Sequence, residues 1–122
     1  MVIDIHTFPG FFEEISQDPK RVAFRREQYF LYKQHVWPLS LFMTQMDAAG
    51  IDKSVISAED VTTLAGDTIV SNEEVRQLVD MHPDRLIGFA SVDPARKDAL
   101  EVLEHRPGCR PRWPGPPPPV WS

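Results

Sequence analysis

Apolar residues along positions 1–105 alternate between short runs and stripes with helical spacing. The runs occupy residues 2–6, 53–57 and 86–92 and are rich in isoleucine and valine, as expected of strands in a parallel sheet. Each run is followed by a helical pattern, and parallel neighbours need such a connection to return to the same end of the sheet. The pattern therefore predicts an α/β fold of three βα units with parallel strands.

Three of the expected helices have recognisable ends. They cover residues 39–49, 71–82 and 93–105, and each carries an apolar stripe. Their end signals are Gly50 as a C-terminal cap, Ser71 and Glu74 spaced as a capping box, and Asp93 followed by Pro94 as an N-cap and first turn.

The segment 11–36 is too long for an ordinary strand-to-helix loop. Residues 21–34 have a weak apolar stripe and are expected to form a helix that ends before Pro38. The aromatic residues in or beside the segment are Phe11, Phe12, Tyr29, Phe30, Tyr32 and Trp37. Two interpretations are open: a lid over the mouth of a pocket, or a peripheral helix that packs through its aromatic rings.

Polar side chains gather where each expected strand ends. They are Asp4, His6 and Thr7, then Ser57, Glu59 and Asp60, then Ser91 and Asp93. The carboxyl ends of parallel strands share one edge of the sheet, so these groups are placed to line a pocket. Each also has a structural interpretation, with Asp93 as a helix cap and with Glu59 and Asp60 as solvated loop carboxylates.

His6 has two possible roles, because an imidazole at the end of a buried strand must be hydrogen-bonded or bound to a metal. Composition alone favours a hydrogen-bonded core histidine.

Composition and charge limit the classes of binding partner that we expect. The 122 residues carry a formal net charge of −5, with no block of basic residues, which argues against nucleic acid. No apolar run is long enough to cross a membrane, and the start of the chain lacks a secretory signal pattern, so we expect a cytoplasmic protein without a membrane partner. The single cysteine, Cys109, predicts neither an internal disulfide nor a thiolate metal site.

Residues 106–122 contain seven of the twelve prolines and mark a sharp boundary after the 1–105 domain. So many missing N–H groups exclude a helix interior or a central strand, and we expect an extended, disordered tail. Two interpretations are open. The tail could be a polyproline II ligand for an SH3 or WW partner, or the product of a shifted reading frame.

Three blocks of the chain resemble one family. The blocks VIDIHTFPG, MDAAGIDKSVIS and HPDRLIGFASVDP resemble, in order and separation, the amidohydrolase superfamily, particularly its aminocarboxymuconate-semialdehyde decarboxylase-like branch. The resemblance covers residues 1–105. It implies the first three βα units of a TIM (β/α)8 barrel and a metal-dependent hydrolase or decarboxylase that acts on a small molecule. An open flavodoxin-like domain is the competing fold, but no strand is followed by a glycine-rich phosphate loop.

The same resemblance implies a divalent metal, zinc or manganese, held by a His-x-His pair at the end of the first strand. His6 matches the first histidine and Asp4 the acidic residue before it, whereas Phe8 stands at the second histidine position. A stable divalent site takes three or four protein ligands. We therefore expect an N-terminal fragment that is inactive alone, binds no metal, and self-associates through its exposed sheet edges.

Overall fold

A computed structural model describes residues 1–104. The expectations for the proline-rich tail, both disorder and the polyproline II ligand, lie outside the described residues. Within the part that is described, no helix is long and apolar enough to cross a membrane.

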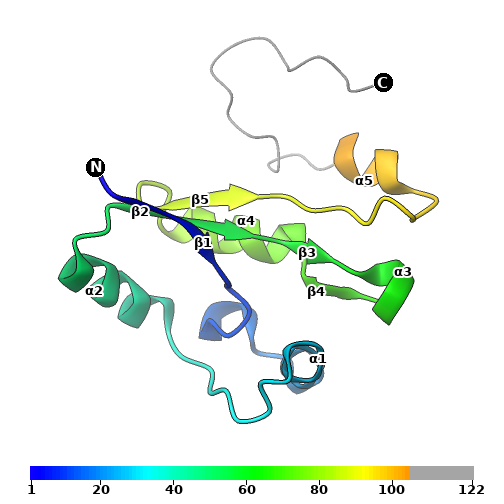
Figure 1. Cartoon of the computed structure of the whole chain (residues 1–122), viewed down its shortest axis with the longest axis horizontal. Coiled ribbons are helices and arrows are strands. Elements are labelled where there is room, and N and C mark those ends of the chain that lie inside the picture. Colours follow the sequence, from blue (N-terminus) through cyan, green and yellow to red (C-terminus); the bar gives the residue numbers. More distant parts are fainter. Residues whose placement is uncertain (105–122) are drawn as a thin grey trace.

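The main sheet has three parallel strands in the order β1, β2, β5 (Figure 1). They are β1 (Ile3–Thr7), β2 (Lys53–Ser57) and β5 (Leu86–Phe89). The parallel pairing predicted from the alternating pattern is thus confirmed for both neighbouring pairs. The strand expected over 86–92 ends earlier, at Phe89, because the backbone N–H of Ser91 donates to the Asn72 side chain, 2.8 Å away, instead of to a strand.

Helices cover one face of this sheet (Figure 1). The 3-10 helix η1 (Glu13–Ile15), α1 (Pro19–Tyr29) and α2 (Leu39–Ala49) lie on that side, and α4 (Asn72–Met81) packs against β5. The core lies between these layers. Its buried members are Phe12, Ile15, Leu39, Met43, Met46, Ile56, Ala58, Ile69, Val70, Val75, Leu78 and Leu86.

Two helices follow their expected end signals closely. Helix α2 ends before Gly50, which has a φ of 71° that glycine adopts without strain. Helix α4 begins after Ser71, and the Ser71 and Glu74 side chains form the reciprocal capping box.

The other two helix expectations are wrong in position. Helix α1 begins at Pro19, where Asp18 caps it, and ends before Phe30, whose left-handed φ of 56° stops the helix well before residue 34. The last described helix, α5 (Ala99–Glu104), does not begin beside Asp93. The Asp93 carboxylate accepts hydrogen bonds from two backbone N–H groups, those of Ala95 and of the distant Thr63. The chain therefore forms turns after Asp93, and the helix begins only later.

A small hairpin that the hydrophobic pattern does not reveal follows β2. Strands β3 (Glu59–Asp60) and β4 (Thr68–Val70) pair antiparallel, and the single turn of α3 (Thr62–Ala65) connects them. With strands of two and three residues, no alternation is long enough to stand out in the sequence.

The other face of the main sheet is open. Ile5 is 79% exposed and Phe89 is 54% exposed, and the side chain of His6 is exposed as well. The expectation that the first strand is buried is therefore wrong. Among the described residues, β1 is an edge strand with one strand neighbour, β2.

Arg25 ties the long segment before α2 to the rest of the fold. Its side chain is fully buried and donates to the carbonyl oxygens of Gly10, Ile15 and Ile69 at 2.8–3.0 Å. Its remaining Nη2 pairs with the carboxylate of Glu74. A buried guanidinium must satisfy its donors, and these four partners come from segments far apart in the chain.

Glu74 is the acidic centre of this cluster. Burial alone raises the pKa of its carboxyl group, but the N–H of Ser71 and the guanidinium of Arg25 outweigh burial and hold the pKa below its usual value of 4.5. Arg21 also contacts Glu74, at 2.6 Å. The native fold therefore favours the ionised form of Glu74 more than the unfolded chain does.

Replacing Arg25 by methionine should lower the free energy of unfolding by about 3 kcal/mol, because it leaves buried carbonyl groups and a carboxylate without their donor. The value lies at the low end for such losses, since Arg21 still faces Glu74. Urea unfolding would measure it. Lys20→Met, an exposed change on the same helix, is the matched control and should leave stability nearly unchanged. Equal effects of the two changes would contradict the role of Arg25.

The depressed pKa of Glu74 predicts a loss of stability in acid. Its contribution is fully present above the unfolded pKa near 4.5 and is lost as the pH falls through the lower pKa of the folded state. Urea unfolding of the parent and of Glu74→Gln between pH 7 and 3 would show this. The difference between the two should shrink as the pH falls, and a constant difference would argue against it.

Candidate functional site

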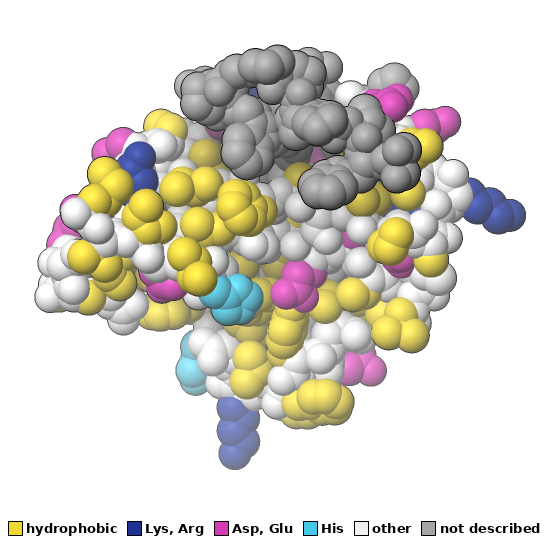
Figure 2. Space-filling model, turned by 45° about the horizontal axis from the view of Figure 1, so that its top comes forward, with side chains coloured by type: hydrophobic (Ala, Val, Ile, Leu, Met, Phe, Trp, Pro, Cys, Tyr) yellow, Lys and Arg dark blue, Asp and Glu magenta, His cyan; other side chains and the backbone are white. Residues whose placement is uncertain are grey.

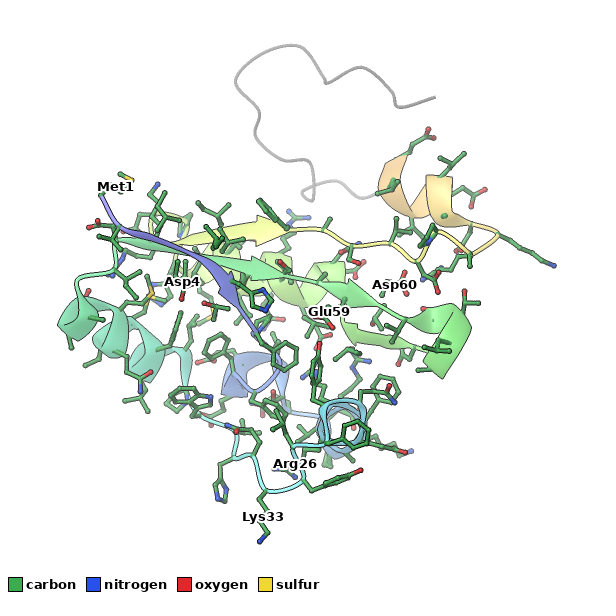
Figure 3. All side chains as sticks on the ribbon, in the orientation of Figure 1. Met1, Asp4, Arg26, Lys33, Glu59 and Asp60 are labelled. Atoms are coloured by element: carbon green, nitrogen blue, oxygen red, sulfur yellow. The ribbon has the colours of Figure 1, made fainter. Side chains whose placement is uncertain are left out.

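The carboxyl ends of β1, β2 and β5 bring two groups of polar side chains together. Figure 3 shows Glu59 and Asp60 along the segment that follows β2, at a distance from Asp4 on β1. The expected convergence of all three strand ends on one cluster is thus only partly realised. One group centres on Asp60 and the other on Glu59.

Asp60 organises the end of β2. Its side chain is only 3% exposed and accepts bonds from the Thr62 hydroxyl at 2.5 Å, from the backbone N–H of Asp93 at 3.0 Å and from Arg96 at 3.1 Å. The interpretation of Asp60 as a solvated loop carboxylate is wrong. Burial raises the pKa of this carboxyl group, but the Thr62 and Asp93 hydrogen bonds outweigh burial and lower it, so Asp60 stays ionised.

Asn72 joins the start of α4 to the chain beyond β5. Its Nδ2 donates to the Ser91 carbonyl at 3.0 Å, and its Oδ1 accepts the Ser91 N–H at 2.8 Å. A shallow cleft of about 310 Å³ opens here, lined among others by Asp60, Asn72, Ser91 and Arg96. Within residues 1–104, every buried side-chain nitrogen and oxygen has a partner. The buried polar side chains of the cleft therefore bind the protein's own chain.

Glu59 belongs to the second group. It accepts a hydrogen bond from the Tyr29 hydroxyl, and the Tyr29 ring lies against Phe8 with centroids 4.4 Å apart. Burial, followed by the bond to Glu59, raises the pKa of Tyr29. Tyr29 therefore remains a neutral donor at neutral pH, and Glu59 is a paired acceptor instead of a free solvated carboxylate.

The Tyr29–Glu59 contact bears on the segment 11–36. It brings the C-terminal end of α1 to the carboxyl end of β2, the position that the lid interpretation requires. Tyr32 is 63% exposed, and Trp37 lies beside Phe12. Of Tyr29, Tyr32 and Trp37, Tyr29 is the one held at a strand end.

His6 and Asp4, the candidate metal ligands, both lie on β1. The Asp4 carboxylate accepts bonds from the His6 backbone N–H at 3.1 Å and the Thr7 hydroxyl at 3.3 Å, and the imidazole is exposed instead of buried as expected. Among residues 1–104, no three His, Cys, Asp or Glu side chains are grouped to hold a metal ion. Phe8 packs on Tyr29 in the place of a second ligand, so the donor set does not fit a divalent ion.

Sequence reasoning missed three residues of these groups: Arg96, Asn72 and the role of Tyr29. Arg96 follows the recognised Asp93–Pro94 pair by two residues, so its reach toward Asp60 could have been suspected. Asn72 carries no comparable signal, because its partner Ser91 lies 19 residues away.

The comparisons with known proteins concern the fold. An uncharacterized TIM-barrel protein from Bordetella bronchiseptica matches with a TM-score of 0.54 and 22% identity over 85% of this chain. The chain spans 39% of the length of that structure. No protein-family model matches the chain, and no curated protein does. The described residues thus form part of a TIM-barrel fold, and the comparisons go no further than the fold.

Replacing Phe8 by histidine should create a chelating pair with His6 and raise zinc or manganese affinity on the order of tenfold. Calorimetric titration of the variant and the parent would measure it. The double variant His6→Ala with Phe8→His is the control and should lose the gain. Unchanged affinity in Phe8→His would mean that positions 6 and 8 do not share a site.

Proposed function

We propose that this chain supplies the first three βα units of an amidohydrolase-like barrel, and that by itself it performs no metal-dependent hydrolysis or decarboxylation. Two lines support the assignment. The three blocks that resemble the family contain β1, β2 and β5, and these strands pair in parallel as a TIM barrel requires. The reaction and its small-molecule substrate belong to the family that the chain resembles.

The observation that carries the second half of the proposal is the donor set at the end of β1. Asp4 and His6 are the two candidate ligands, and Asp4 already accepts two bonds from its own strand. Two ligands hold a divalent ion too weakly to compete with water and buffer. Without the ion, no metal-bound hydroxide forms near neutral pH.

The remaining strand-end residues then have a positioning role. Asp60 and Asn72 hold the ends of β2 and β5 in register, and Glu59 holds α1 over the same edge through Tyr29. A barrel places its reacting groups at this edge. In this proposal the described units shape the edge, and catalysis needs groups that residues 1–104 do not supply.

The test is a titration of the purified full chain with zinc and with manganese, combined with assays of ester, amide and decarboxylation substrates at each metal concentration. We expect no saturable one-to-one binding and no turnover above the metal blank. One-to-one binding that His6→Ala abolishes, together with turnover, would overturn the proposal. The exposed change Lys33→Met is the control for nonspecific loss of binding.

A further inference from the structure

Residues 26–36, which we call the flap, lie between two firmly held positions. Before the flap, Arg25 is fully buried and donates to three backbone carbonyl groups. After the flap, Trp37 donates its N–H to the Phe11 carbonyl at 3.0 Å and accepts the Glu13 N–H at 2.8 Å. Both ends of the flap are therefore fixed to the body of the fold.

The flap itself is held together by internal contacts. Arg26 donates through Nε and Nη2 to the Gln34 carbonyl at 2.9 and 2.7 Å. The rings of Phe30 and Tyr32 contact each other edge to face, with centroids 6.5 Å apart. Figure 3 shows Arg26 and Lys33 on the side of α1 that faces away from the sheet. These contacts keep the flap compact without tying it to the sheet.

Tyr29 joins the flap to the sheet. Its hydroxyl donates to the carboxylate of Glu59, at the start of β3, and its ring lies against Phe8, just after β1. Apart from the helical bonds of α1, this is the single hydrogen bond between the flap and the rest of the described chain. Both contacts of Tyr29 lie at the carboxyl edge of the main sheet.

The residue after this contact has a strained backbone. Phe30 has a left-handed φ of 56°, which a bulky side chain rarely adopts, and such a conformation persists only where surrounding contacts hold it. Its side chain is 79% exposed, so packing in the core does not provide that restraint. Exposed apolar side chains also occur elsewhere on the surface (Figure 2), so this exposure alone does not indicate an interface. The contacts of Arg26 and Tyr29 therefore hold the flap in its conformation.

We propose that the flap is a lid over the carboxyl edge of the sheet and that the hydrogen bond from Tyr29 to Glu59 is its latch. When this bond breaks, the last turn of α1 is released, while Arg25 and Trp37 stay in place. Opening exposes the Glu59 carboxylate and the Phe8 ring at the edge where a barrel places its reacting groups. The lid does not depend on the metal donor set, so the failure of either proposal leaves the other intact.

Hydrogen exchange of the full chain, measured by mass spectrometry, tests the latch. Tyr29→Phe removes the hydroxyl and keeps the ring, so exchange over residues 26–36 should rise on the order of tenfold, while exchange over α4 should not change. Tyr32→Phe is the matched control, because Tyr32 is an exposed tyrosine of the same flap, and it should leave the exchange unchanged.

Three exchange results would overturn the proposal. The first is an unchanged rate over residues 26–36 in Tyr29→Phe. The second is a rise of equal size over α4, which would mean that the whole fold is destabilised. The third is a parent protein in which residues 26–36 already exchange as fast as unprotected amides, because such a flap has no closed state.

Carboxyl labelling with a carbodiimide and an amine tests what opening exposes. Glu59 should react faster in Tyr29→Phe than in the parent, whereas the exposed Glu101 should react equally in both. A flap that stays closed would still shield Glu59 with the aromatic ring at position 29. Equal labelling of Glu59 in the two proteins would therefore overturn the proposal.

Two changes at Glu59 separate the latch from a general effect of the site. Glu59→Gln keeps an oxygen that can accept the Tyr29 hydroxyl, whereas Glu59→Ala does not. Hydrogen exchange over residues 26–36 should therefore be slower in Glu59→Gln than in Glu59→Ala, and Tyr29→Phe should add little to Glu59→Ala. Equal exchange in the two Glu59 variants, or fully additive effects, would contradict the latch.

Discussion

The buried guanidinium of Arg25 is the interaction on which the arrangement of the chain depends. The segment between β1 and α2 has no strand of its own in the main sheet. Hydrophobic contacts are not directional, so they alone would not fix the position of this segment against the rest of the fold. Arg25 fixes it by directional bonds to the carbonyl oxygens of Gly10 and Ile69 and by an ion pair with Glu74. Because each bond needs a set geometry, α1 has one position relative to β4 and α4. That position brings Tyr29 to the end of β2.

At the carboxyl ends of the strands, polar side chains likewise bind other segments of the chain. In a barrel enzyme this edge offers its side chains to a substrate. Here Asp60, Asn72 and Ser91 bind one another's segments, and Glu59 binds Tyr29. Groups already paired in this way must break a bond before they can bind a ligand. Phe8 lies nearby, with its ring against that of Tyr29.

Apolar side chains are exposed on the outer strands of the main sheet. In this three-stranded parallel sheet, apolar side chains on the two outer strands, such as Ile5 and Phe89, are exposed, whereas Val55 on the central strand is buried. The same strands can be apolar on both faces because a barrel buries both.

Local patterns in the sequence determined the three parallel strands, helix α2 with its Gly50 cap and helix α4 with its capping box, because each depends on residues a few positions apart. The tertiary structure alone decided the burial of Asp60, the ion pair of Arg25 and the exposure of His6. These depend on partners 30 to 50 residues away, or on whether a neighbouring strand is present. Hydrophobic periodicity does not indicate which distant polar groups form contacts, because those contacts form only when the helices and the sheet pack together.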